Sequence, residues 1–208
     1  MDAIENLHRE ILRCTHCQDA GCIERAAPVV CAPLRSPMVL IGQAPGQVEL
    51  TKRYPFAGRA GRELFRWIRS IGIEEEEFRA RVYMTSITKC FPGKATTGSG
   101  DRRPSGREIS FCRPWLEWQL ALLRPRVVLL VGGLAIERYF PKRQLRELIG
   151  KRFDLEGVAY IPLPHPSGAS RWLNQPANRD LLRLALILMR EEWDLHLGAS
   201  GRVPAAAR

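Results

Sequence analysis

Short apolar runs alternate along the chain with longer segments in which apolar residues recur at three- and four-residue intervals. The short runs are typical of buried strands, and the longer segments have the period of an amphipathic helix. Ile4, Leu7 and Ile11, for example, lie on one side of a helix at the start of the chain. The pattern predicts strands at residues 38–41, 82–88, 126–131 and 159–163, and helices at residues 3–13, 61–71, 106–123, 134–140, 142–149 and 178–197.

Strands that alternate with helices predict a parallel sheet with helices on both faces. The expected fold class is therefore α/β, a three-layer αβα sandwich around a central four-stranded, mostly parallel sheet. A chain of 208 residues suits a single domain. We place this domain at residues 1–197 and expect residues 198–208 to form a disordered tail. Residues 93–106 are rich in Gly, Ser and Arg and lack an apolar pattern, which predicts a flexible basic loop.

The peptides that follow the predicted strands have an unusual composition. In open α/β sheets, ligands bind outside the carboxyl ends of the strands. Because four strand ends meet at one edge of such a sheet, a single functional site there is the simplest prediction. The peptides are Gly42-Gln43-Ala44-Pro45-Gly46, Ser86, Gly132-Gly133 and His165-Pro166-Ser167.

The chain is basic: 32 Lys and Arg against 22 Asp and Glu give a formal net charge of +10. A surplus of this size favours a polyanionic partner, and nucleic acid is the commonest one. No apolar run approaches the roughly 18 residues of a membrane span. The first residues also lack the basic and apolar regions of a secretory signal. We therefore expect a monomeric cytoplasmic protein, associated with the nucleoid in a bacterium, with no membrane partner.

Six cysteines in a protein of the reducing cytoplasm indicate metal binding or reactivity rather than disulfides. Cys14 and Cys17 are separated by two residues, a spacing that lets both thiolates turn toward one metal centre. The sequence therefore predicts a metal site that begins just after the first helix.

Two pairs of cysteines compete to complete this metal site. Cys22 and Cys31 would form a local zinc site with the first two. Cys90, after the second predicted strand, and Cys112, in the predicted helix at 106–123, would instead close a four-cysteine site around an iron–sulfur cluster. Spacing alone leaves both alternatives open, and the cysteines that are not ligands are then ordinary buried thiols.

Five motifs in a fixed order carry a family resemblance. They are Gly42-Gln43-Ala44-Pro45-Gly46, Tyr54-Pro55-Phe56-Ala57-Gly58-Arg59-Ala60-Gly61, Thr85-Ser86-Ile87-Thr88-Lys89-Cys90, Cys112-Arg113-Pro114-Trp115-Leu116 with Gln119, and His165-Pro166-Ser167. Together they resemble the family 4 (iron–sulfur) uracil-DNA glycosylases. That family has a Gly-Glu-Ala-Pro-Gly loop, a Pro-Phe-Val-Gly-x-Ala-Gly segment, a Thr-Asn-Val-Val-Lys-Cys strand, a Cys-x-Pro-x-Leu-x-x-Gln helix and the same closing His-Pro-Ser. The resemblance extends over about residues 14–190.

The resemblance implies a monofunctional hydrolase that acts in base-excision repair of DNA. Such an enzyme flips a deaminated base, here uracil, out of the DNA helix and hydrolyses its N-glycosidic bond to leave an abasic site. The resemblance also implies a [4Fe-4S] cluster and leaves Cys22 and Cys31 as ordinary thiols. The implied cluster ligands are Cys14, Cys17, Cys90 and Cys112.

Two of the implied site residues act on the base itself. Phe56 would stack on the flipped base, a contact worth on the order of 1–3 kcal/mol. His165 would donate a hydrogen bond to the O2 of the departing pyrimidine, where negative charge develops. One such donor is typically worth about 10²–10³ in rate.

The loop after the first strand supplies the other implied catalytic groups. The backbone amides around Ala44 and Gly46 would lie beneath the flipped nucleotide. Gln43 cannot act as a base, so it would orient water or contact the base. Ala44 stands where the best-known glycosylases of the superfamily have a water-activating Asp, so most of the rate must come from stabilising the leaving group. Glu49, which matches an acidic residue of the family's loop, would position the water.

Contacts with DNA are expected from two further segments. Residues 166–172, including Ser167, resemble the loop that wedges into the DNA helix, and Arg171 would fill the gap left by the flipped base. The basic residues at 94–107 would bind phosphates, which position the DNA without specifying its sequence.

Two residues depart from the family pattern. Gln43 replaces a Glu, and Ser86 replaces the Asn that reads the edge of uracil. A serine has one short hydroxyl and cannot make the two contacts of an amide. The base is therefore open: hypoxanthine and xanthine are alternatives to uracil, and a lesion-binding iron–sulfur protein without catalysis is a third. Residues 93–106 contain no histidine, so covalent trapping of DNA by such a residue is not expected.

Overall fold

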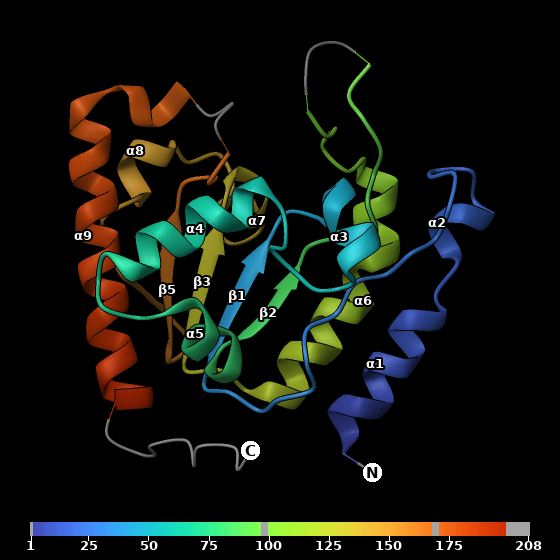
Figure 1. The fold of residues 1–208 in the computed structure, drawn as a ribbon, viewed down its shortest axis with the longest axis horizontal. Helices are drawn as coiled ribbons and strands as arrows, with labels where there is room; N and C mark the ends of the chain where they lie inside the picture. The colour runs from blue at the N-terminus through green and yellow to red at the C-terminus, as the bar shows by residue number, and fades with distance from the viewer. Residues whose placement is uncertain (1, 97–99, 168–170, 199–208) are drawn as a thin grey trace.

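The computed structural model describes residues 2–96, 100–167 and 171–198, and it has the expected α/β fold (Figure 1). A five-stranded sheet has the strand order β2-β1-β3-β5-β4. Four strands run parallel, and β4 pairs with β5 in the antiparallel direction. The strands are β1 (Met38–Gly42), β2 (Tyr83–Ser86), β3 (Val127–Val131), β4 (Phe153–Leu155) and β5 (Val158–Leu163).

The prediction of a four-stranded sheet is wrong by one strand. The additional strand, β4, is only three residues long and largely exposed, so it has no apolar run that could indicate it. It forms a hairpin with β5, and the turn between them contains Glu156 and Gly157, both with positive φ. The predicted strand at 82–88 is shorter in the structure because the chain bends after Ser86.

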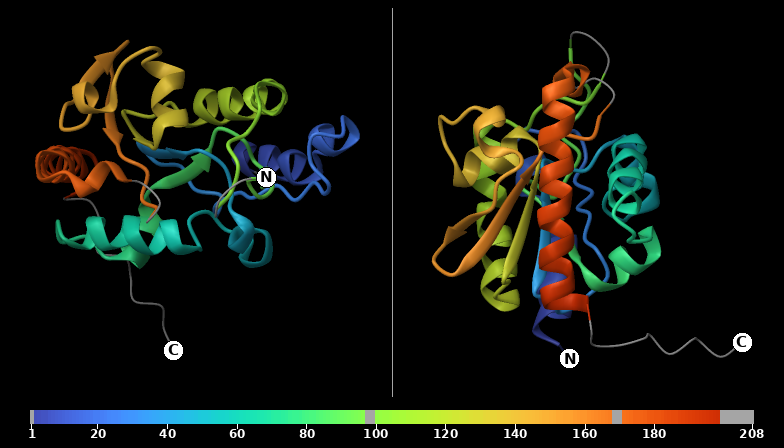
Figure 2. Two further views of the ribbon diagram at one scale, coloured as in Figure 1. Left: turned by 90° about the horizontal axis from the view of Figure 1, so that it is seen from above. Right: turned by 90° about the vertical axis from the view of Figure 1, so that its left-hand side faces the viewer.

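Helices cover both faces of the sheet, which confirms the layered arrangement (Figure 2). Helices α4, α5 and α9 pack on one face, and α1, α6, α7 and α8 pack on the other. The helices are α1 (Ala3–Arg13), α2 (His16–Asp19), α3 (Gln47–Lys52), α4 (Arg59–Arg69), α5 (Glu75–Arg81), α6 (Gly106–Leu123), α7 (Gly133–Tyr139), α8 (Leu145–Leu148) and α9 (Pro176–Trp193), with a short 3₁₀ helix at Arg171–Asn174 and a π-helical turn at Asp194–Gly198.

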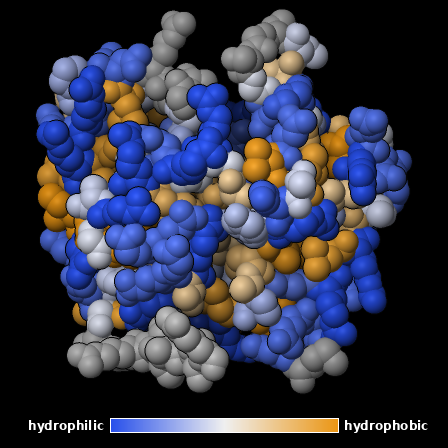
Figure 3. All heavy atoms as spheres, in the orientation of Figure 1, coloured by the Kyte–Doolittle hydropathy of each residue, from blue (hydrophilic) through white to orange (hydrophobic). Residues whose placement is uncertain are grey.

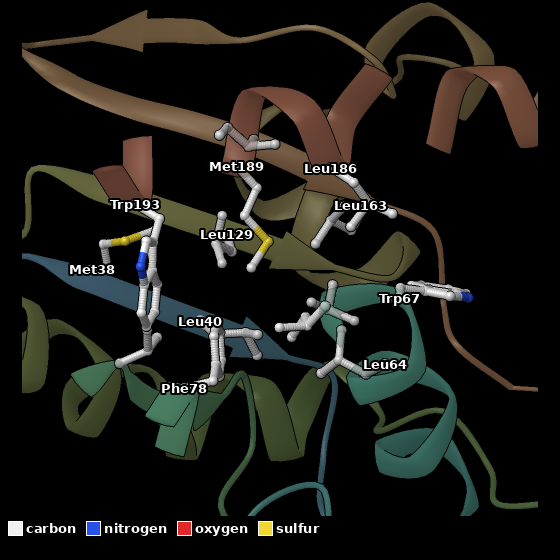
Figure 4. Packing of buried hydrophobic residues seen from close by; sticks show 14 of the residues in the cluster. Met38, Leu40, Leu64, Trp67, Phe78, Leu129, Leu163, Leu186, Met189 and Trp193 are labelled. Atoms are coloured by element: carbon white, nitrogen blue, oxygen red, sulfur yellow. The ribbon is translucent and has the colours of Figure 1, made fainter. Parts of the chain in front are cut away.

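Alternate residues of each strand point to opposite faces, so both layers of the core draw on the same strands. In β1, Met38 and Leu40 pack toward α4, α5 and α9, while Val39 and Ile41 pack toward α1 and α6. This burial on both sides explains why β1 and β3 are uninterrupted apolar runs. Figure 4 shows the first of these layers, in which Trp193 stacks on Phe78 and closes the end of α9 against α5.

Helices α1 and α6 begin and end where the sequence predicts because their ends are encoded locally. Asp2 and Glu5 form a capping box at α1, and Ser105 and Glu108 form one at α6. The helix predicted at 178–197 is observed at Pro176–Trp193 and continues as the π-helical turn. Helices α3 and α5 are too short to show a periodic pattern, and the predicted helices at 61–71 and 142–149 are shifted or shortened. Gly198 ends the π-helical turn, and the rest of the predicted tail, 199–208, lies outside the described residues. No helix in the described ranges has the length and apolar character needed to cross a membrane.

Candidate active site

The peptides singled out in the sequence lie together at the carboxyl edge of the sheet. Gly42 at the end of β1 pairs with Ser86 at the end of β2. On the other side of β1, the amide of Gly132 donates to the carbonyl of Leu163, which joins the ends of β3 and β5. The arrowheads of these strands point to the same edge in Figure 1. One site built from four strand ends is therefore geometrically possible.

Phe56 lies over the end of β1. A Cβ atom built on Gly42 would be 2.8 Å from Cζ of the Phe56 ring. The side chain is only partly buried, and it packs against the core layer that includes Met38, Leu40 and Met84. By strand alternation, positions 42 and 86 face this same layer. The ring of Phe56 and the side chain of Ser86 therefore share one face of the sheet.

Arg79 of α5 holds the Phe56 turn in place. Its guanidinium donates to the carbonyl oxygens of Pro55 and Phe56, both at 2.8 Å, and its Nε donates to Glu75 at 2.8 Å. Phe56 has a φ of 55°, a left-handed conformation that is uncommon for an aromatic residue and must be stabilised by its surroundings. A Cβ on Gly61 would be 1.8 Å from the carbonyl oxygen of Phe56, so only glycine allows α4 to pack this close.

Ser86 is buried, and both its hydroxyl and its carbonyl have partners within the protein. The hydroxyl donates to the carbonyl oxygen of Thr88 at 2.7 Å. The Ser86 carbonyl accepts from Nζ of Lys89 at 2.6 Å. These bonds fix the peptide at the end of β2.

Lys89 begins a buried chain of hydrogen bonds beneath the site. Its ammonium donates to Oγ1 of Thr85 at 2.9 Å, and this hydroxyl donates to Oε1 of Gln119 at 2.9 Å. Nε2 of Gln119 donates to the hydroxyl of Tyr83 at 2.7 Å, which leaves the Tyr83 proton for Nε2 of His8, 2.6 Å away. Burial lowers the pKa of Lys89 to about 7. It also lowers the pKa of His8, whose neutral ring can accept the Tyr83 proton.

His165 packs against the end of β3. Gly132 has a φ of 88°, and a Cβ there would be 2.8 Å from Cδ2 of the imidazole. Glycine is thus required both by the backbone and by the approach of the ring. Loss of solvent lowers the pKa of His165, so the imidazole is neutral near pH 7 and has one N–H to donate.

The loop after β1 is braced by Glu49. Its Oε2 accepts from the Gly46 amide at 3.1 Å, and its Oε1 accepts from the Gly58 amide at 2.9 Å. The buried carboxylate therefore links this loop to the start of α4. The carbonyl of Gln43 accepts from the Thr88 amide at 3.2 Å, which ties the same loop to the segment after β2. Gln43 and Ala44 are partly exposed at the edge of the sheet.

Asp101 reaches this loop from the basic segment and is not singled out by the sequence. A Cβ on Gly46 would be 3.0 Å from Oδ2 of Asp101 and 2.9 Å from Oε2 of Glu49. Oδ1 of Asp101 accepts from Nζ of Lys94 at 2.8 Å, and residues 94 and 101 form an antiparallel bridge. An acidic residue within an otherwise basic loop is the one sequence signal that could have indicated it.

The four cysteines that the resemblance implies as ligands lie in one neighbourhood. Cys14 follows α1, Cys17 lies in α2, Cys90 follows β2 and Cys112 lies in α6. A hydrogen bond from Cys17 raises its own pKa and lowers that of Cys112. Burial, together with the charges of Cys112 and Cys14, raises the pKa of Cys90 to about 12. These thiols are thus close enough to interact electrostatically.

The two remaining thiols have further contacts of their own. The thiol of Cys22 faces the carbonyl of Ala20 at 3.9 Å, and its charge contributes to the raised pKa of Cys17. Cys31 is partly buried against both core layers, and loss of solvent raises the pKa of its thiol to about 12. All six cysteines are free. In the ranges that the structure describes, no three His, Cys, Asp or Glu side chains meet at the spacing of a single metal ion. A cluster places its ligands farther apart, because each thiolate binds a different iron atom.

The segment predicted to wedge into DNA is described only in part. Ser167 is partly buried and follows His165, whereas residues 168–170 lie outside the described residues. Arg171 begins the short 3₁₀ helix. The roles predicted for Ser167 and Arg171 remain predictions.

A comparison with protein families shows the family of the chain. A model described as the Uracil DNA glycosylase superfamily matches residues 28–186. The chain belongs to the uracil-DNA glycosylase superfamily. The matched residues include every strand of the sheet and the residues predicted for the base, the water and the leaving group.

Individual members of the superfamily resemble the chain over most of its length. The type-4 uracil-DNA glycosylase of Archaeoglobus fulgidus is 30% identical over 176 residues, which is 80% of this chain and 83% of the relative. The type-4 enzyme of Sulfurisphaera tokodaii is 26% identical over 220 residues, 97% of this chain and 94% of the relative. That of Thermotoga maritima is 30% identical over 152 residues, 72% of each chain. The resemblance to family 4 is thereby confirmed.

Proposed function

We propose that the chain is a monofunctional DNA glycosylase that flips a deaminated base, uracil first, and hydrolyses its N-glycosidic bond to leave an abasic site. The observation that carries this proposal is the placement of an aromatic ring, Phe56, and a neutral imidazole, His165, at one sheet edge with Ser86. The similarity to type-4 uracil-DNA glycosylases supports uracil as the first candidate base.

The chemistry requires a surface for the flipped base and a donor for the charge that it takes away. Flipping costs a few kcal/mol, which stacking on Phe56 offsets by about 1–3 kcal/mol. As the bond to the sugar breaks, negative charge collects on the pyrimidine O2. The N–H of neutral His165 donates to this oxygen, and one such donor is worth about 10²–10³ in rate. Burial strengthens the interaction because water no longer screens it.

The attacking water would be oriented by the loop after β1. Gln43 lies partly exposed in that loop and can donate or accept. Glu49, in α3 directly after this loop, is the carboxylate proposed to position the water, and it also keeps the loop in shape through two backbone hydrogen bonds. Since Ala44 offers no acidic group, the rate depends mainly on leaving-group stabilisation by His165.

DNA is the expected substrate polymer because the superfamily acts on it and the chain carries a net charge of +10. On the face shown in Figure 3, hydrophilic side chains predominate. Lys94 and Arg107 of the basic segment, with Ser167 and Arg171 after the histidine, are the proposed contacts.

Four cysteines fit a [4Fe-4S] cluster as its ligands: Cys14, Cys17, Cys90 and Cys112. Two observations support this assignment: the four residues supply soft thiol donors, and the fold brings them together from the end of α1, from α2, from the segment after β2 and from α6. When bound, the cluster would cross-link these four segments through iron–thiolate bonds. It would thereby hold the Thr85–Cys90 segment, which includes Ser86, against α6.

The proposal is tested by single-turnover cleavage of a labelled duplex that contains one uracil opposite guanine, followed by alkali. We expect strand cleavage by the wild type and a loss of about 10²–10³ in rate for His165→Ala. His196→Ala, which removes a partly exposed histidine of the π-helical turn at Asp194–Gly198, should cleave at the wild-type rate. If folded wild-type protein leaves uracil, hypoxanthine and xanthine intact, the enzymatic proposal is wrong and lesion binding is the better account.

A further inference from the structure

The hydroxyl of Ser86 has only one proton, and that proton is already committed. Its Oγ is 2.7 Å from the carbonyl oxygen of Thr88. A carbonyl cannot donate, so the serine must be the donor in this bond. What remains on Ser86 for a bound base is the pair of lone pairs on its oxygen, which can only accept.

The carbonyl that captures this proton is itself held in place. It belongs to the peptide between Thr88 and Lys89, whose N–H donates to Sγ of Cys112 at 3.4 Å. The Lys89 ammonium fixes the Ser86 peptide from the other side at 2.6 Å. Rotation of the Ser86 hydroxyl toward a base would leave the buried Thr88 carbonyl without its donor, which is unfavourable. The acceptor-only state of Ser86 is therefore built into the fold.

We infer that Ser86 selects bases by a ring N–H, an inference that rests on the glycosylase function proposed above. Deamination of cytosine to uracil, or of adenine to hypoxanthine, replaces an amino group with a carbonyl and places a proton on the adjacent ring nitrogen. Xanthine, the deamination product of guanine, also carries a ring N–H, so all three bases present an N–H to Ser86. Cytosine and adenine present a bare nitrogen lone pair, which an acceptor repels.

The same geometry broadens the range of bases beyond uracil. An amide side chain at this position would contact both the ring N–H and the neighbouring carbonyl, and so would fix the position of a pyrimidine ring. Ser86 fixes only the N–H, and the small residue Gly42 beside it imposes no further shape. A purine and a pyrimidine can each place their N–H on Ser86 while they lie under Phe56. Thymine and guanine also carry this N–H, so Ser86 separates uracil and hypoxanthine from cytosine and adenine but does not by itself exclude thymine or guanine.

The test is a set of matched duplexes with uracil, hypoxanthine, xanthine, cytosine or adenine at one position, cleaved under single-turnover conditions. We expect the wild type to act on the first three and not on the last two. Ser86→Ala should lower the rates for the first three by about ten- to a hundredfold, the effect of leaving a buried N–H without its acceptor. Ser86→Asn should retain uracil and lose at least about tenfold on hypoxanthine.

Two further variants separate recognition from folding. Ser86→Thr keeps the hydroxyl and should keep the wild-type preference, so it decides the matter if the alanine variant does not fold. Ser70→Ala removes a hydroxyl that likewise donates to a backbone carbonyl, at the end of α4, and should leave all rates unchanged. Cleavage of uracil alone, or unchanged relative rates in Ser86→Ala, would overturn the inference and leave the glycosylase function standing. Inactivity of the wild type on every base would refute both.

Discussion

The ring of Phe56 packs so closely against Gly42 that it fits there only because Gly42 has no side chain. A Cβ on Gly42 would be 2.8 Å from Cζ and 3.2 Å from Cε2 of the ring. Gly42 is at the end of β1, where its backbone adopts the strand pairing with Ser86. Its lack of a side chain therefore serves the position of the ring rather than the conformation of the backbone.

Gly42→Ala should displace Phe56 and impair base stacking while the fold persists. A displacement of about 1 Å at a reacting centre can cost roughly a hundredfold in rate, and overpacking costs about 1–3 kcal/mol of stability. We expect single-turnover uracil excision to fall by about ten- to a hundredfold. Gly133→Ala is the matched control, because a Cβ there meets no atom within 4 Å. Equal rates for the two variants would show that the contact with Phe56 does not matter for activity.

Arg79→Lys should loosen the Phe56 turn. The guanidinium donates to two neighbouring carbonyls and to Glu75 at once, which a single ammonium cannot reproduce. We expect excision to slow by about tenfold with a loss of about 1 kcal/mol in the free energy of unfolding. Arg69→Lys, in an exposed pair with Glu74, should change neither. If the excision rate of Arg79→Lys equals that of the wild type, the hydrogen bonds that hold the Phe56 turn do not contribute to catalysis.

The fold is predictable where the signal is local. The ends of α6 follow from Ser105 and Glu108, which cap it, and the buried strands follow from their apolar runs. The missed strand β4 is different, because it owes its existence to pairing with β5 and not to its own residues. Long-range pairing of a short exposed segment leaves no periodic trace in the sequence.

The site residues also divide into those that a local sequence signal indicates and those that only the folded structure brings together. Gly42, Ser86 and His165 stand out in the sequence because they follow apolar strands, and parallel pairing brings them to one edge. Arg79 does not stand out, since it is 23 residues from the carbonyl of Phe56 that it holds. The chain of polar groups from Lys89 to His8 is likewise visible only when α1, α6 and β2 are placed side by side.

Stability should decrease as the pH falls below 6.5 because His8 is buried as a neutral ring. Burial, and then the charge of Lys89, lowers its pKa from 6.5. The unfolded chain therefore binds a proton that the folded chain does not, and stability is lost as pH falls below 6.5. Denaturant unfolding at pH 5.5 and 7.5 measures this, and His8→Asn should reduce the difference between the two. The pKa of His165 is lowered in the same direction, so some dependence should remain in the variant. An undiminished difference would assign the effect to other groups.

Metal analysis of single cysteine variants should identify the ligands. Cys112→Ser should purify with little iron and acid-labile sulfide and without the brown colour, because a serine hydroxyl binds iron far more weakly than a thiolate. Cys22→Ser should retain all three, since its thiol faces the carbonyl of Ala20. The reverse result, with zinc bound and lost in Cys22→Ser and Cys31→Ser, would indicate the local zinc site instead.

Glu49→Gln distinguishes two roles for Glu49: bracing the loop after β1 through backbone hydrogen bonds, or positioning the attacking water. Each oxygen of Glu49 accepts from a backbone amide, Gly46 on one side and Gly58 on the other. An amide side chain has only one acceptor, so its NH₂ must face one of these N–H groups. If Glu49 acts as a brace, the free energy of unfolding should fall by about 1–3 kcal/mol, and the excision rate should fall with it because the loop moves. Glu10→Gln, at an exposed pair on α1, should alter neither quantity. A large loss of rate at wild-type stability would instead place Glu49 at the attacking water, and the bracing role would have to be abandoned.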